Sequence, residues 1–338
     1  MLSHEAEINA LNPKYLSMGQ MLLHQFQPGQ TTLDGVAAPF PNFATTIQNC
    51  APSVAQALLP YPQYCSGLFG ADENAGNSTY HSFQFKVERR FSQGVWLLGS
   101  YTWSKLLTDS DNAEAPAGGL GQEGVFSPFS RKLNKSLAQE DIPQALAISF
   151  SYELPFGRGK RWAANVGALD KVLGGWEVSS VFRAQSGIPF YVISSACNVP
   201  GPFQVACLPG LLPGKSPFLQ HGSINPGLRL LDPNAFESPN SFNFYSGQGP
   251  RVENFRQPSY RNNDIALEKR IPINEKFTFS LRGEFFNAWN WHYFNSVGLP
   301  GANASMAFAN DVASPDFGKW NGEVTNPRNI QVSARIKF

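Results

Sequence analysis

The chain has 338 residues, enough for one large or two ordinary domains, and its 26 basic and 25 acidic residues give a formal net charge of +1. Because there is no excess of positive charge, electrostatics give no reason to expect nucleic acid as a partner. Only 15% of the residues are charged, 13% are aromatic, and 30 glycines and 26 prolines supply many turns. This composition favours an all-β protein that also meets an apolar environment.

The sequence shows neither a transmembrane helix nor a secretion signal. A membrane-spanning helix needs ~20 largely apolar residues in a row, and the best apolar runs, such as 145–150, are far shorter. Residues 1–10 contain His4, Glu5 and Glu7 and lack the basic start and apolar stretch of a signal peptide. For an exported protein, this predicts either a misassigned start or a piece of a longer chain.

The first segment in chain order, 1–78, is expected to be a long extracellular loop region. It contains Cys50 and Cys65, and a second close pair, Cys197 and Cys207, follows in another segment rich in proline and glycine. Both spacings are far wider than the roughly two to four residues of a zinc knuckle. If these segments are extracellular, we expect a local disulfide within each pair.

Seven segments within 79–338 alternate apolar and polar side chains with a period of two, as does a strand with one apolar and one polar face. In the first of them, Phe83 and Phe85 alternate with Gln84 and Lys86. Most are about ten residues long, which is the length that crosses a bilayer at a tilt. Charges on the polar faces and aromatics on the apolar faces indicate a water-filled or plugged lumen inside and lipid outside. The segments are 81–91, 95–104, 146–154, 176–185, 264–270, 277–285 and 330–338.

The connections between these segments alternate in length. Long extracellular loops and short periplasmic turns are the pattern of a transmembrane barrel. The alternative, a soluble β-sandwich, also has alternating strands, but these are usually shorter and joined by modest loops. We therefore predict an antiparallel transmembrane β-barrel portion with long outer loops. Counted back from a periplasmic Phe338, the outer connections are 288–328, 187–260, 105–143 and 1–78, and the inner ones are 271–276, 155–175 and 91–94.

The number of strands bears on completeness. Bacterial single-chain barrels have an even number of strands and begin and end in the periplasm, whereas the seven segments begin on the outer side. An eighth strand could lie at 15–23, but the alternation there is poor. Truncation at the N-terminus is the simpler account, so the expected fold is an incomplete barrel of seven or eight strands.

Several short motifs follow one another along the chain. In combination and in this order they resemble the C-terminal barrel of the Oar-like TonB-dependent receptors, and the resemblance covers essentially the whole chain. Each motif alone is weak, whereas the combination is specific. The motifs are NPKYL at 12–16, AQALLPYPQY at 55–64, GSYTWSK at 99–105, YELPFG at 152–157, GGW at 174–176, RGEFFNAWN at 282–290 and ARIKF at 334–338.

The resemblance implies a function and a set of partners. Such receptors resemble transporters of roughly 22 strands whose lumen is plugged, and a segment before the plug binds the energy-coupling protein TonB. The resemblance therefore implies a bacterial outer-membrane protein, surrounded by lipid, that takes up an unidentified external ligand with TonB coupled through N-terminal parts outside this sequence. It also implies that the barrel-assembly machinery reads the terminal Phe338. No substrate-contacting residue can be carried over.

Nothing in the sequence predicts covalent chemistry, a cofactor or a metal site. The five histidines show no metal-ligand spacing, and the glycine pattern at 119–124 lacks the strand and helix of a dinucleotide site. We therefore expect a protein that is not an enzyme. The alternatives to a transporter are an outer-membrane adhesin or structural barrel and, less favoured, a small outer-membrane enzyme, for which no Ser/His/acid set can be assembled.

Aromatic residues in the longest outer connection are a candidate ligand surface. Phe236, Phe242, Phe244 and Tyr245 lie close together among amide side chains and glycines. Exposed aromatic rings with amide neighbours could bind a glycan or a peptide. Packing of the loop against its neighbours is the favoured interpretation.

Overall fold

The computed structural model describes residues 4–65, 68–73, 76–109, 129, 131–138, 140–162, 170–189, 192–196, 208–221, 225, 227–237, 253–292, 310–319 and 326–338. The elements before the main sheet are β1 (His4–Glu7), η1 (Pro13–Leu23), β2 (Thr32–Leu33), β3 (Val36–Ala37), α1 (Phe43–Thr46), α2 (Val54–Ala57) and β4 (Phe69–Glu73). The main sheet contains β5 (Ser78–Ser92), β6 (Val95–Thr108), β7 (Ser136–Leu137), β8 (Gln144–Glu153), β9 (Trp176–Gln185), β10 (Tyr260–Pro272), β11 (Thr278–Phe286) and β12 (Asn329–Lys337). Between its strands lie α3 (Arg131–Asn134), α4 (Asp170–Leu173) and the 3-10 helix η4 (Pro233–Ala235).

The seven long strands of the main sheet form one antiparallel wall, which we call the strand wall. Their order is β12-β11-β10-β9-β8-β6-β5, and the two-residue β7 pairs with β6 beside this path. Each long strand coincides with one of the seven alternating segments, so the predicted all-β, antiparallel fold is confirmed. The expectation that 15–23 could hold an eighth strand is wrong, because η1 occupies these residues.

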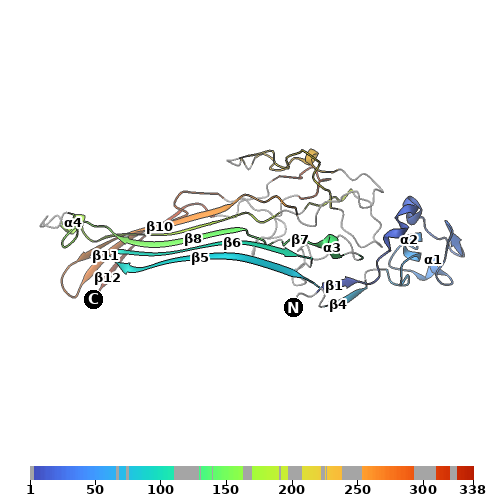
Figure 1. Cartoon of the computed structure of the whole chain (residues 1–338), viewed down its shortest axis with the longest axis horizontal. Coiled ribbons are helices and arrows are strands. Elements are labelled where there is room, and N and C mark those ends of the chain that lie inside the picture. The colour runs from blue at the N-terminus through green and yellow to red at the C-terminus, as the bar shows by residue number, and fades with distance from the viewer. Residues whose placement is uncertain are drawn as a thin grey trace.

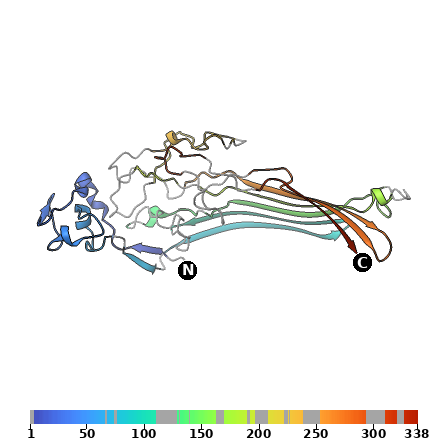
Figure 2. The same ribbon diagram turned by 180° about the vertical axis from the view of Figure 1, so that it is seen from behind.

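The two ends of the strand wall differ, as predicted from the connection lengths. At the inner end, Gln93 and Gly94 alone join β5 to β6, both with positive φ (54° and 79°), as a tight hairpin turn requires. At the outer end the connections are long, including 186–259 between β9 and β10. Figures 1 and 2 show from both sides that the outer segments gather at one end of the strands and α4 and the C-terminus lie at the other.

Gly175 fixes the inner connection that contains α4. Its φ of +72° is one that side chains rarely adopt, and a Cβ there would lie only 2.2 Å from the carbonyl oxygen of Arg270. In return, the Arg270 amide donates to the Gly175 carbonyl at 2.8 Å. Only glycine lets this turn approach β10 so closely before β9 begins.

The strand wall has no hydrophobic core of its own. Among the described residues of its long strands, Ala266 is the single buried apolar residue. The buried clusters lie in the outer segments instead, one within 11–59 and the other built from two outer connections, those between β9 and β10 and between β11 and β12. A sheet without a covering layer needs another apolar medium on one face.

Residues 4–65 and 68–73, here called the cap, fold around the first of these clusters beyond the outer end of β5 (Figure 1). Phe26 and Phe43 meet edge to face with ring centroids 5.3 Å apart in its centre. The Asn12 and Ser53 side chains accept backbone hydrogen bonds at the starts of η1 and α2. The sequence predicted only a long extracellular loop here; the structure adds a core, and the extracellular location stays a prediction.

The edges of the strand wall give a first test. Among the described residues, β5 and β12 each pair with a long strand on one side only, and unpaired backbone groups in lipid cost several kcal/mol each. We therefore expect this chain, refolded alone in detergent micelles, to form no closed barrel. On SDS gels it should migrate alike with and without boiling, while a complete outer-membrane barrel refolded in parallel shifts. A compact, protease-resistant, heat-modifiable species would contradict this expectation.

Candidate functional site: the two faces of the strand wall

The register of the strands sorts their side chains into one apolar and one polar face. One row across four strands consists of Phe85, Tyr101, Leu146 and Ala184, each opposite the next. Neighbouring rows on the same face carry Phe83 opposite Trp103, which expose 60% and 59% of their surface. A continuous exposed apolar face over strands of this length matches the lipid-facing outside of a barrel.

Aromatic side chains gather where this apolar face reaches the outer end. The Trp291 ring lies 6.4 Å from the Phe182 ring and, on another side, 4.5 Å from the Arg261 guanidinium. Trp289 stands beside it at 6.4 Å and is more than half exposed. Amphipathic rings with a cation at one level of a barrel are typical of the membrane–water interface.

The polar face carries a network of charges across β8 to β11, which we call the charge ladder. The register places Glu153 opposite Glu177 and Glu177 opposite Glu268, so three carboxylates stand side by side. Like charges directly opposite each other destabilise a sheet. Arg270 compensates all three, with its guanidinium nitrogens 3.9 Å from Glu153, 2.5 Å from Glu177 and 2.9 Å from Glu268.

The charge ladder continues in both directions from Arg270. Arg282 on β11 lies 3.3 Å from Glu268 and 3.0 Å from Glu284. Lys160, from the inner connection, approaches Glu153 at 2.8 Å. Partly exposed ion pairs stabilise a protein mainly as members of a network. Because charged side chains are costly in lipid, the charge ladder indicates water or polar partners on this face.

A second polar contact ties two outer connections to the rim of the strand wall. The side chain of Asp141, which precedes β8, is almost fully buried and accepts from the Leu106 amide at 2.5 Å and from the Arg256 guanidinium. Arg256 also donates to the carbonyls of Asp141 at 2.6 Å and Gly187 at 3.3 Å. The last residues before β10 are therefore held against the residues just before β8 and against the beginning of their own connection, just after β9.

The outer aromatics were expected to pack, and Phe236 does so. It is 2% exposed and lies with ring centroids 5.4 Å from Phe317 and 5.9 Å from Phe255. Leu230 and Leu231 complete the centre of this second core. The other three aromatic residues of the prediction lie outside the described residues, so only Phe236 is assigned to packing.

The carboxyl group of Glu253, beside this second core, has a raised pKa. Burial, and secondarily the negative charge of Glu237, raises the pKa of Glu253 to about 7 from its ordinary 4.5. Glu237 itself accepts a hydrogen bond from the Gly210 amide at 2.9 Å. The outer connections therefore contain a group that changes charge near neutral pH.

The structure locates some of the individually predicted residues. Cys50 and Cys65 form a disulfide within the cap. The proposed pair Cys197 and Cys207 lies outside the described residues. Phe338 follows β12 at the inner end, 96% exposed and with its ring centroid 6.5 Å from that of Phe277; its role in assembly stays a prediction.

The described residues contain neither a metal-ligand cluster nor a membrane-spanning helix. No group of three or more His, Cys, Asp or Glu side chains there could hold a metal ion. No helix in the described part of the chain is long and apolar enough to span a membrane.

The sequence over residues 3–331 matches the family described as outer membrane beta barrel domain. The chain belongs to this family. Its place is accordingly the bacterial outer membrane, with lipid against the apolar face of the strand wall.

Other comparisons add little to the family assignment. No curated protein matches the sequence. Among solved structures, the chain is similar to P. aeruginosa FpvA in complex with heterologous pyoverdine and iron, at 13% identity and a TM-score of 0.33. The match covers 82% of this chain and 21% of FpvA, so the chain spans about a fifth of that protein's length.

Arg270 provides a test of the charge ladder. Arg270→Ala leaves the adjacent Glu153, Glu177 and Glu268 without their shared cation, and we expect the free energy of unfolding to fall by about 1–2 kcal/mol. The measurement is the urea midpoint of the protein in outer-membrane vesicles isolated from cells that express it, where it is assembled in its native membrane. The matched control is Lys86→Ala, whose 3.1 Å pair with Glu88 is exposed; it should change stability by under about 0.5 kcal/mol. Equal effects of the two substitutions would contradict a special role of Arg270.

Glu253 predicts a pH dependence of the outer connections. Since its folded pKa of about 7 exceeds the ordinary 4.5, the folded state holds a proton that the unfolded state releases between these values. Protonated Glu253 therefore stabilises the folded state fully below about pH 4.5. This contribution to the free energy of unfolding, at most about 3 kcal/mol, is lost as pH rises through about 7. Protease cleavage of these connections should accelerate from pH 5 to pH 8.

Two variants check the assignment to Glu253. Glu253→Gln should make the cleavage rate independent of pH over this range, because the amide does not titrate. Glu237→Gln should reduce the dependence only in part, because the charge of Glu237 is the smaller cause of the shift. An unchanged profile in Glu253→Gln would assign the dependence to another group.

Proposed function

We propose that the chain is the C-terminal part of the barrel of an Oar-like TonB-dependent receptor, which takes up an unidentified external ligand. The observation that carries this proposal is the charge ladder, a network of paired charges on the face of a membrane-spanning wall that points away from lipid. The ordered series of motifs in the sequence supports the same assignment. The FpvA similarity is too weak to add an argument.

The two faces of the strand wall have different roles in this proposal. The apolar face holds the protein in the bilayer, since each large apolar side chain kept from water contributes roughly 1.5–3 kcal/mol. The polar face lines the lumen, where its fixed and mutually paired charges offer hydrogen-bond partners to a plug. Through that plug, TonB would supply the energy for transport, and the barrel-assembly machinery would read Phe338.

The proposed protein does no covalent chemistry. Its role is to bind a ligand outside and to admit it through the lumen. An adhesin or structural barrel is the second candidate, and the cap favours it because a folded, disulfide-linked unit at the outer end suits surface binding. The two candidates differ in what occupies the lumen.

The test is site-specific photocrosslinking of the protein in its native outer membrane. A photoreactive phenylalanine analogue replaces Thr102 on the polar face or, as the matched control, the adjacent Tyr101 on the apolar face. We expect the Thr102 position to crosslink to a globular plug and the Tyr101 position to crosslink to lipid only. Sequencing upstream of the Met1 codon should reveal that plug in frame, preceded by a TonB-binding segment.

The opposite result would contradict the proposed transport function. A Thr102 position that yields no protein crosslink, together with a signal peptide followed directly by a further strand, would indicate an open or structural barrel. A plug without a TonB-binding segment would also contradict energised uptake.

A further inference from the structure

We propose that the cap carries a binding site for a neutral, polyhydroxylated ligand, a unit of an uncharged oligosaccharide. The site is a pocket of about 400 Å³ lined by residues 46–49, 63–65 and Leu68. Its volume is within the range of ~300–1,000 Å³ that is usual for small-molecule sites. This inference goes beyond the proposed function, since the pocket could bind whether or not the barrel transports.

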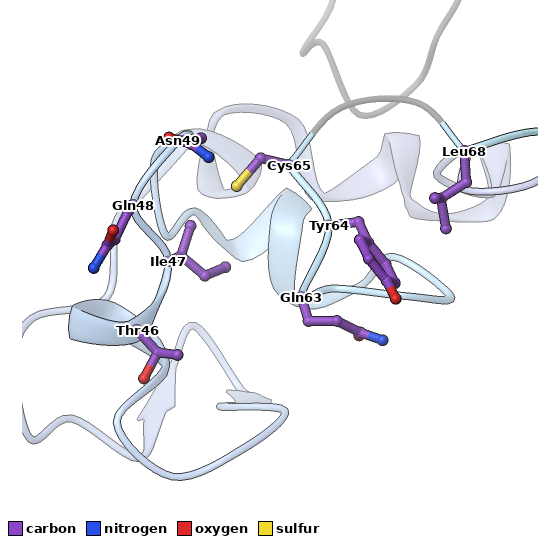
Figure 3. A pocket seen from close by; sticks show the side chains of 8 residues that line it. All are labelled: Thr46, Ile47, Gln48, Asn49, Gln63, Tyr64, Cys65 and Leu68. Atoms are coloured by element: carbon purple, nitrogen blue, oxygen red, sulfur yellow. The ribbon is translucent and has the colours of Figure 1, made fainter.

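Two chain segments face each other across the pocket (Figure 3). One follows α1, whose last turn is closed by the Ile47 amide donating to the Phe43 carbonyl at 3.3 Å. The other contains the end of the turn 61–64 after α2. The disulfide between Cys50 and Cys65 joins the two segments next to the pocket.

The turn 61–64 is held by two buried amide side chains. Asn9 accepts from the Tyr61 amide at 2.9 Å and donates to the carbonyls of Tyr61 at 3.1 Å and Tyr64 at 3.4 Å. Gln56 donates to the carbonyls of Pro62 and Tyr64, both at 2.8 Å. Because this wall is fixed before a ligand arrives, binding loses little conformational entropy there.

The chemistry of the lining selects the ligand class. Thr46, Gln48, Asn49 and Gln63 offer neutral donors and acceptors, and none of the described lining residues carries a charge. An anionic ligand would lose its hydration without meeting a cation, and a cation would meet no carboxylate. Neutral hydroxyl groups match both the donors and the acceptors of such a lining.

Tyr64 supplies the apolar part of the contact. Its side chain is half exposed, while its backbone is fixed by Asn9 and Gln56. A rigid tyrosine ring offers a large flat surface at a low entropic cost, and the C–H face of a sugar ring stacks on such a surface. The lining therefore combines neutral polar side chains with one aromatic ring, a composition that suits a sugar rather than an ion.

The test measures binding of labelled oligosaccharides to the protein in outer-membrane vesicles isolated from cells that express it. The neutral probes are maltohexaose, cellohexaose, xylohexaose and mannohexaose, and the comparison ligands are a hexamer of galacturonate and a neutral hexapeptide. We expect at least one neutral oligosaccharide to bind at least tenfold more tightly than both comparison ligands. Tyr64→Ala should weaken this binding about tenfold or more, and Tyr64→Phe by less than about threefold.

The matched control is Tyr61→Ala, which removes a similarly exposed tyrosine of the same turn that does not line the pocket. It should leave binding within about twofold. Formation of the Cys50–Cys65 disulfide, seen as a mobility shift on reduction, shows that each variant has a folded cap. The proposal is overturned if no neutral oligosaccharide outcompetes the comparison ligands, or if both tyrosine-to-alanine variants weaken binding equally. Loss of the lumen crosslinks described above would leave this result unchanged, so the two proposals fail independently.

Discussion

An apolar sheet face that no part of the described chain covers is the constraint on which the rest of this structure depends. In a soluble sandwich, a second sheet or a layer of helices would bury Phe83, Phe85 and Val332, whereas here they are 60%, 55% and 69% exposed. Water would oppose such a surface by roughly 25 cal/mol per Å². Lipid removes that penalty, and the antiparallel ladder satisfies the backbone groups that lipid cannot.

The same constraint decides where charge is placed. Side chains of a strand alternate, so every charged residue that faces away from the lipid must share its face with the charges of neighbouring strands. Glu153, Glu177 and Glu268 consequently stand side by side. Arg270 lies two residues beyond Glu268 on the same face of β10, where its guanidinium reaches all three carboxylates. The lumen side thus acquires an internally neutralised surface instead of a strongly acidic one.

The outer segments follow a different principle. Their sequences do not alternate with a period of two. They bury apolar side chains in small cores, and side-chain hydrogen bonds hold their backbone. The Arg256–Asp141 contact fastens one of them to the rim, and Asn9 and Gln56 brace the turn that borders the pocket of the cap. Binding surfaces commonly lie on loops carried by a rigid scaffold, and this division of labour matches that pattern.

The sequence alone determined the strand wall, because a period of two along one strand is local information that survives without any knowledge of its neighbours. It located all seven long strands, their two faces and the alternation of short and long connections. It also proposed the Cys50–Cys65 pair from proximity in the chain. Only the tertiary structure decided which residues meet: register sets three glutamates beside Arg270, and the cap core joins Leu11 to Val54 and Phe43. These contacts link residues far apart in an aperiodic sequence, and no local pattern encodes them.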